Sequence, residues 1–179
     1  TGPMSRVLVS LLALALLAPS PSSAQRRRAR VAPAAAPVLD SDGETAMLAR
    51  INQLRGEEGV PPLERHPGLD AAAQAHSVDM ASHEELVHVS ERTGDPGRRV
   101  REAGVGTLRV GENIARAENT RAAFGSILGS EAHRAQVLDA GFTHIGLASV
   151  SGPDGMYVTQ VFASLAPPPA ELPPPAVMD

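Results

Sequence analysis

The residues best suited to chemistry lie in the run Gly111-Glu112-Asn113-Ile114, where a carboxylate and a carboxamide stand side by side. On a half-buried strand, Val110, Glu112 and Ile114 share one face, because successive side chains point to opposite sides. A carboxylate among apolar neighbours is costly to bury unless a partner compensates it. The chain offers three such partners, namely His88, His133 and Tyr157. We therefore expect them to converge on Glu112 in one pocket; the alternative is that Glu112 is an ordinary exposed strand residue.

Two kinds of chemistry would follow from that pocket. Glu112, His88 and His133 could hold Zn²⁺ or another divalent cation with a water molecule in the fourth position, and Tyr157 or Ser130 would then assist a reacting group. Without a metal, Glu112 and His133 are the candidate catalytic residues, with Glu112 as a general base. A third alternative is a hydrogen-bonded structural cluster that holds loops to the sheet, since buried polar groups are normally satisfied in this way.

The recognised hydrolase motifs are missing from the sequence. There is neither an HExxH helix nor a Gly-x-Ser-x-Gly elbow. Ser130 followed by His133 does not indicate a triad, because serine at a helix start is usually a cap. His76 and His83 lie two helical turns apart, too far for direct chelation from one straight helix, and we interpret both as structural or exposed.

Composition excludes further classes of function. The net charge of -4 and the pI of about 5.8 give no basic surface for nucleic acid. Aromatic residues make up 2% of the 179 residues, so stacking platforms are scarce and the core must consist of Leu, Val, Ile, Ala and Met. The absence of cysteine excludes a disulfide framework, thiolate metal sites and cysteine nucleophiles.

The N-terminal part has the pattern of an export signal. Met4-Ser5-Arg6 is a short positive start, and the apolar run Val7 to Leu17 has signal-peptide length, too short for a comfortable membrane span. Small residues precede the expected cleavage after Ala24, which predicts a secreted or periplasmic protein whose mature form has no transmembrane segment; an uncleaved anchor is the alternative. Thr1-Gly2-Pro3 precede the expected start and read as residues left by cloning or a mis-assigned start.

The remaining chain divides by composition into three parts. Residues 25–40 form a linker with four arginines and an Ala/Pro run, which we expect to be disordered or extended and not packed. Residues 166–179 carry six of the 16 prolines and read as a disordered tail. Residues 41–165 are the expected folded domain.

Within this domain, helical patterns come first and a hairpin last. We expect helices from 41 to Gly59, from His66 onward, over 98–103, over 120–128 with Thr120 as cap, and after Ser130, and strands over 108–115, 145–150 and 156–164. This order predicts an α+β fold with helices covering an antiparallel sheet.

The ordered set of motifs is more specific than any one of them. The set comprises Met47 to Arg55 with Gly59 and Pro62-Leu63, Leu69 with Ala72-Ala73 and His76 to Ala81, His88, Gly111 to Ile114, Ser130 with His133-Arg134 and Val137-Leu138, Phe142 with Ile145-Gly146, and Thr159 to Phe162. In this order and spacing, nearly all of Gly43 to Ser164 resembles the CAP superfamily of cysteine-rich secretory, antigen-5-like and pathogenesis-related group 1 proteins. It looks closest to the cysteine-free bacterial branch.

The resemblance implies a three-layer α-β-α sandwich around a small antiparallel sheet, and an extracellular setting. Many members of the family have a cavity with two histidines and two acidic residues that binds a divalent cation. His88 matches the first histidine and Glu112 the first acid, whereas the second acid falls at Ser130 and the second histidine at Tyr157. The four-residue set is therefore incomplete here.

Two more positions bear on the resemblance. His133 matches a feature of the bacterial branch and would supply a second imidazole, while the common tryptophan falls at Ile127. The resemblance implies a pocket lined by His88, Glu112, Asn113, Ser130, His133 and Tyr157. Several CAP proteins are linked to sterol, fatty-acid or other small-lipid binding, but a shared fold does not fix function. We thus expect a non-catalytic secreted binding module for a divalent cation or a small lipid, with a metal-dependent hydrolase or protease and a structural cluster with a protein-interaction role as alternatives.

Overall fold

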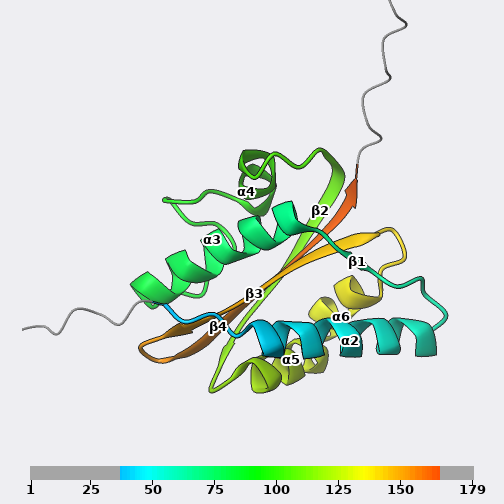
Figure 1. Cartoon of the computed structure of the whole chain (residues 1–179), viewed down its shortest axis with the longest axis horizontal. Coiled ribbons are helices and arrows are strands. Elements are labelled where there is room, and N and C mark those ends of the chain that lie inside the picture. The colour runs from blue at the N-terminus through cyan, green and yellow to red at the C-terminus, as the bar shows by residue number, and fades with distance from the viewer. Residues whose placement is uncertain (1–36, 166–179) are drawn as a thin grey trace, which may run out of the picture. The chain divides into compact units, whose positions relative to one another are not determined.

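The structure, a computed structural model, describes residues 37–165 (Figure 1). The predicted signal peptide, most of the linker 25–40 and the tail 166–179 lie outside the described residues. The elements in chain order are α2 (Ser41–Glu57), β1 (Glu64–Arg65), α3 (Pro67–His83), α4 (Pro96–Glu102), β2 (Thr107–Ala117), α5 (Thr120–Gly129), α6 (Glu131–Leu138), β3 (His144–Gly152) and β4 (Gly155–Leu165).

The four strands form one sheet in the order β1-β3-β4-β2. β3 and β4 are the predicted hairpin, paired antiparallel from His144 with Ala163 to the turn at Gly152 and Gly155. β2 pairs antiparallel with the other side of β4, so that Glu112 lies opposite Val161. The two-residue β1 adds a parallel pairing to β3.

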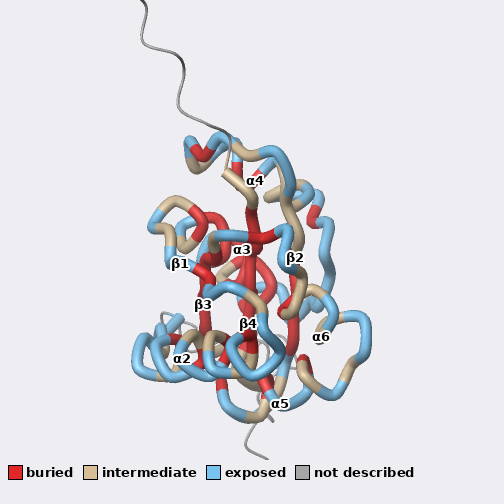
Figure 2. The backbone as a smooth tube through the Cα atoms, turned by 90° about the vertical axis from the view of Figure 1, so that its right-hand side faces the viewer, coloured by how far each residue is buried: buried red, intermediate tan, exposed pale blue. Residues whose placement is uncertain are grey.

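The helices cover both faces of this sheet. α3 packs on β3 and β4 with α4 beside it, and α2, α5 and α6 pack on the other face (Figure 1). The predicted three-layer α-β-α sandwich is confirmed. Buried residues lie mainly along the strands, between the helical layers (Figure 2).

Strand alternation supplies each layer with its own apolar core. Ile145 and Leu147 of β3 face α2, where Met47, Ile51 and Phe124 join them. The intervening β3 residues face α3, and Gly146 lies directly against the backbone of α3, where a Cβ would overlap backbone atoms of Leu69. A glycine at this position lets helix and strand approach closely.

The helix starts differ in detail from the prediction. Asp40 caps α2, and its side chain accepts a hydrogen bond from the Gly43 amide. α5 is capped by Asn119 and not by Thr120, and Ser130 occupies the cap position of α6 without a side-chain cap hydrogen bond. In α2 and α5, the side chain of the residue before the first helical residue thus accepts a hydrogen bond from an amide of the first turn.

The last residues of the expected linker belong to the folded domain. The Asp40 amide donates to the Ser149 carbonyl at 3.0 Å, and the Ser151 amide donates to the Val38 carbonyl at 2.9 Å. The packed part therefore begins before Ser41, because these residues pair with the end of β3. Within residues 37–165, none of the helices has the length and apolarity needed to cross a membrane.

Candidate functional site

Glu112 lies in the middle of β2 and points toward α3 and α4. As predicted, it shares this face with Val110 and Ile114, which join the cores beneath α3. Its side chain is only 2% exposed. The alternative of an exposed strand carboxylate is therefore wrong.

Each oxygen of the Glu112 carboxylate has a side-chain partner. Arg99 of α4 donates from Nη2 to Oε2 at 2.6 Å, and both side chains are 2% exposed. Nδ1 of His88 lies 2.9 Å from Oε1, and this imidazole is half exposed. His88 therefore contacts Glu112, and Arg99 supplies the counter-charge that a buried carboxylate needs.

His76 of α3 is the fourth residue of this cluster, together with Glu112, Arg99 and His88. Its Nε2 lies 2.7 Å from the Val87 carbonyl and 3.8 Å from Glu112 Oε1, and the side chain is fully buried. Burial lowers the pKa of His76 below its ordinary value, the nearby Arg99 acts in the same direction, and the Glu112 carboxylate opposes the shift. A neutral imidazole that donates from Nε2 to the Val87 carbonyl fits this environment.

The same cluster fixes the loop over residues 84–95. Arg99 donates to the carbonyls of His88 and Gly94 at 3.1 and 2.5 Å, in addition to Glu112. Arg92 of the loop pairs with the buried Asp79 of α3, at 2.5 Å from Nε to Oδ1. Buried polar groups thus hold the backbone of this loop from within the domain.

His133 does not join the cluster, which corrects the prediction. Asn113, the residue after Glu112, points to the opposite face of β2, where its Nδ2 donates to the His133 carbonyl and to Gln160 Oε1, both at 3.1 Å. α6 therefore lies across the sheet from the Glu112 carboxylate. Residues 37–165 contain no group of three His, Asp or Glu side chains spaced to hold a metal ion, so the predicted set of His88, Glu112 and His133 is not assembled.

Tyr157 and Ser130 are also apart from Glu112. Tyr157 pairs with Arg116 in the sheet register, four residues along β2 from Glu112, or roughly 13 Å at the rise of a strand. Its hydroxyl donates to Asp154 at 2.7 Å. Ser130 starts α6 on the opposite face. The predicted single pocket is therefore divided between two faces of the sheet.

This arrangement limits what Glu112 can do chemically. A general base needs a lone pair within reach of the substrate proton, and a metal ligand needs a lone pair that the ion can approach. Both Glu112 oxygens are engaged and the side chain is buried, whereas the imidazole of His88 reaches the surface. The geometry favours a structural cluster that orients one exposed histidine.

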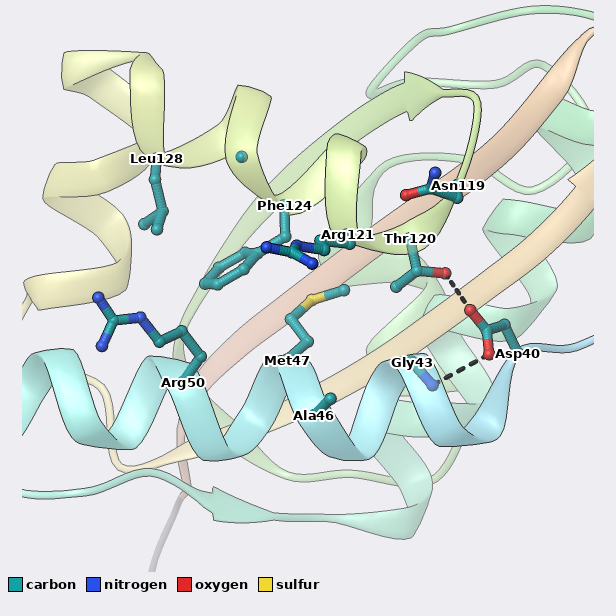
Figure 3. Close-up of a pocket in the computed structure, with 11 residues that line it drawn as sticks. Asp40, Gly43, Ala46, Met47, Arg50, Asn119, Thr120, Arg121, Phe124 and Leu128 are labelled. Atoms are coloured by element: carbon teal, nitrogen blue, oxygen red, sulfur yellow. Dashed lines mark hydrogen bonds between the residues drawn. The ribbon is translucent and has the colours of Figure 1, made fainter.

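A separate groove lies on the other face, between α2 and α5. It encloses about 710 Å³. Met47 of α2 and Phe124 of α5 point toward each other across it, with Leu128 beyond them and the exposed Arg50 and Arg121 at its mouth (Figure 3). None of the predicted pocket residues lines this groove.

Sequence reasoning missed Arg99 and this groove. Arg99 belongs to a seven-residue helix, too short for its buried face to show in the apolar spacing. The sequence does indicate the burial of His76, because this residue falls on the apolar stripe of α3 with Leu69 and Met80. The groove arises from helices distant in sequence, and no local pattern marks it.

The comparisons with known proteins agree with this fold. The family described as CAP, the cysteine-rich secretory protein family, matches residues 48–162. Two Bacillus subtilis proteins are similar to the chain: the uncharacterized protein YkwD, 32% identical over 71% of this chain, and the uncharacterized membrane protein YlbC, 33% identical over 69%. The chain spans 49% and 35% of the lengths of these relatives.

Solved structures give the same result. An extracellular protein from Bacillus anthracis that contains an SCP domain is 31% identical, with a TM-score of 0.60 over 66% of this chain and 39% of its own. An outer surface protein of Borrelia burgdorferi is 15% identical, with a TM-score of 0.67 over 73% of this chain and 98% of its own. The second likeness shows the fold alone.

Proposed function

The chain belongs to the CAP (cysteine-rich secretory protein) family, and we propose that it is a secreted, non-catalytic binding module whose groove between α2 and α5 takes a single-chain lipid with an anionic head. The observation that carries this proposal is the apolar groove with arginines at its mouth. The similar protein from Bacillus anthracis is extracellular, which supports export together with the signal-peptide pattern of residues 1–24.

The composition of the groove selects this class of ligand. Its walls include Ala46, Met47, Phe124 and Leu128, which favour an apolar chain. Arg50 and Arg121 lie one on each helix and are exposed. A guanidinium pairs strongly with a carboxylate or phosphate, so the two arginines complement an anionic head.

The Glu112 cluster supports a role without catalysis. Arg99 neutralises the carboxylate, and His76, Arg99 and Glu112 together hold the 84–95 loop in place. The ligand set for a metal-dependent hydrolase is dispersed over both faces of the sheet, so the geometry offers that alternative no support.

A divalent cation at His88 is a second candidate. The imidazole is half exposed, and its Nδ1 is held by a carboxylate, the arrangement that commonly orients a metal-bound histidine. A single imidazole binds a metal ion weakly, so an external ligand or partner would have to supply the remaining ligands of the ion.

Calorimetric titration of dodecanoate into the chain tests the first candidate. We expect saturable binding that weakens by roughly tenfold in the variant Arg50→Gln/Arg121→Gln, since two exposed charge pairs contribute up to about 1 kcal/mol each. Arg134→Gln is the matched control, because Arg134 is a partly exposed arginine that pairs with Glu58 outside the groove. No binding in the wild type, or equal binding in the double variant, would contradict the proposal. Zn²⁺ titration with and without His88→Ala tests the second candidate.

A further inference from the structure

One end of the groove is tied shut by a side-chain hydrogen bond. Thr120, the first residue of α5, donates from its hydroxyl to Asp40 Oδ2 at 2.6 Å, and the other oxygen of Asp40 accepts from the Gly43 amide at 3.0 Å (Figure 3). Asp40 is the cap of α2. One carboxylate therefore both ends a helix and holds the start of a second helix against it.

The two ends of the groove differ in this respect. Asp40, Gly43, Asn119 and Thr120 line the tied end, and Thr120 is only 3% exposed. At Gly43 a Cβ would overlap the Asp40 carboxylate, so a larger residue there would displace the tie. The other end opens beyond Met47 and Phe124, between Arg50 and Leu128 (Figure 3).

Charge fixes the orientation of an amphiphile in such a groove. The Thr120 hydroxyl and the Gly43 amide lower the pKa of Asp40, in that order of importance, so this carboxylate is ionised near neutral pH. An anionic head is repelled from the Asp40 carboxylate and attracted to Arg121, whose side chain lies beside Phe124, and to Arg50 at the open end (Figure 3). The apolar chain then runs past Met47 and Phe124 toward Thr120.

We propose that the pair formed by Asp40 and Thr120 is the end wall of the groove and sets the longest acyl chain that it accepts; this inference rests on the proposed lipid-binding function. From Gly43 to Arg50 the helix rises by roughly 10 Å. A chain that exceeds this distance must leave its excess in water, where it adds no affinity. The tie also keeps α5 in position, so the limit is fixed before the ligand enters.

Fatty acids of increasing length, from octanoate to hexadecanoate, test this inference by calorimetric titration. In the wild type, affinity should rise with each added carbon up to a limit and then remain level or fall. Thr120→Ala removes the hydroxyl and the methyl group from the wall. We expect its limit to move toward longer chains, with a gain of about tenfold for the acid two carbons beyond the wild-type limit, the gain from burying two more methylenes.

Two further variants separate the wall from the general stability of the domain. Thr120→Ser keeps the hydroxyl donor but loses the methyl group, and its limit should stay closer to that of the wild type than the limit of Thr120→Ala. Asp40→Asn keeps a capping side chain but removes the charge, and should allow the head to bind at either end, which makes the length limit less sharp. Circular dichroism melts confirm that each variant is folded before its affinities are compared.

The failures of the two proposals are distinguishable. If the wild type binds none of the acids, the proposed lipid-binding function fails. If the wild type binds them without a length limit, or if folded Thr120→Ala and Asp40→Asn both retain the wild-type limit, the end wall is overturned while lipid binding stands.

Discussion

Removal of the Glu112 carboxylate should destabilise the domain severely. In Glu112→Ala, Arg99 loses its buried counter-charge, and the imidazole of His88 loses its acceptor. Loss of one member of a buried ion pair costs about 3 to 5 kcal/mol. Arg99 keeps the carbonyls of His88 and Gly94 as acceptors, which places the expected loss near the lower end, at about 3 kcal/mol.

Urea unfolding of the wild type and the variant measures this loss directly. A loss of this size corresponds to a fall in Tm of roughly 10 °C for a domain of this length. The matched control is Glu102→Ala, because Glu102 pairs with Arg98 on the same helix, α4, at 2.7 Å but with both side chains at least half exposed. That exposed pair should contribute less than about 0.5 kcal/mol.

A double-mutant cycle separates the ion pair from the other contacts of Glu112. Arg99→Met/Glu112→Leu replaces both charges with apolar side chains, and should be destabilised by less than the sum of the two single variants. If Glu112→Ala lost less than about 1 kcal/mol, or if the two substitutions were additive, the cluster would not be the structural element that we describe.

Other predictions concern groups whose burial sets their effect. Arg55 is fully buried and donates to the carbonyls of Pro61, Val137, Asp139 and Phe142, so Arg55→Met should leave these acceptors unpaired and lower the free energy of unfolding by about 3 kcal/mol in urea titrations; a loss below about 1 kcal/mol would refute its role. Gly146→Ala should destabilise by at least about 2 kcal/mol because its Cβ would overlap α3, whereas Gly56→Ala in open space on α2 should stabilise by about 0.5 to 1 kcal/mol. Burial lowers the pKa of His76 in the folded state, so the contribution of its neutral imidazole to the free energy of unfolding is complete above the unfolded pKa of about 6.5 and is lost as the pH falls below that value. The stability of the wild type should therefore fall more steeply from neutral pH to about pH 5 than that of His76→Gln, and parallel pH profiles would contradict this.

Most of the fold could be predicted from the sequence because its elements carry local signals. The alternation of residues 145–150 and 156–164 around Gly152 and Gly155 predicts the hairpin, and the structure confirms it. The apolar spacing of α2 and α3 fixes their buried faces. The cap residues could not be assigned from the sequence, because adjacent polar residues such as Asn119 and Thr120 both suit a helix start, and the packed structure selects Asn119.

The candidate site was predicted less completely, for two physical reasons. The contact of His88 with Glu112 followed from the need to compensate a buried carboxylate, but Arg99 fulfils most of that need, and no pattern marks it in the sequence. His133 was misplaced because the expected convergence ignored the alternation of β2. A helix that contacts Asn113 cannot also contact the side chain of Glu112, since adjacent strand residues point to opposite faces.

That alternation also explains why the Glu112-Asn113 pair characterises the fold better than the function. Glu112 holds Arg99 and the 84–95 loop on the α3 face, while Asn113 connects α6 and Gln160 on the other. One dipeptide at the centre of an edge strand thus anchors a layer on each side of the sheet. Substitutions here would loosen both layers whatever the ligand is, so loss of a function in such variants does not identify a binding residue. Variants at Arg50, Arg121 and Thr120, which lie at the groove and outside this cluster, provide the more specific test of function.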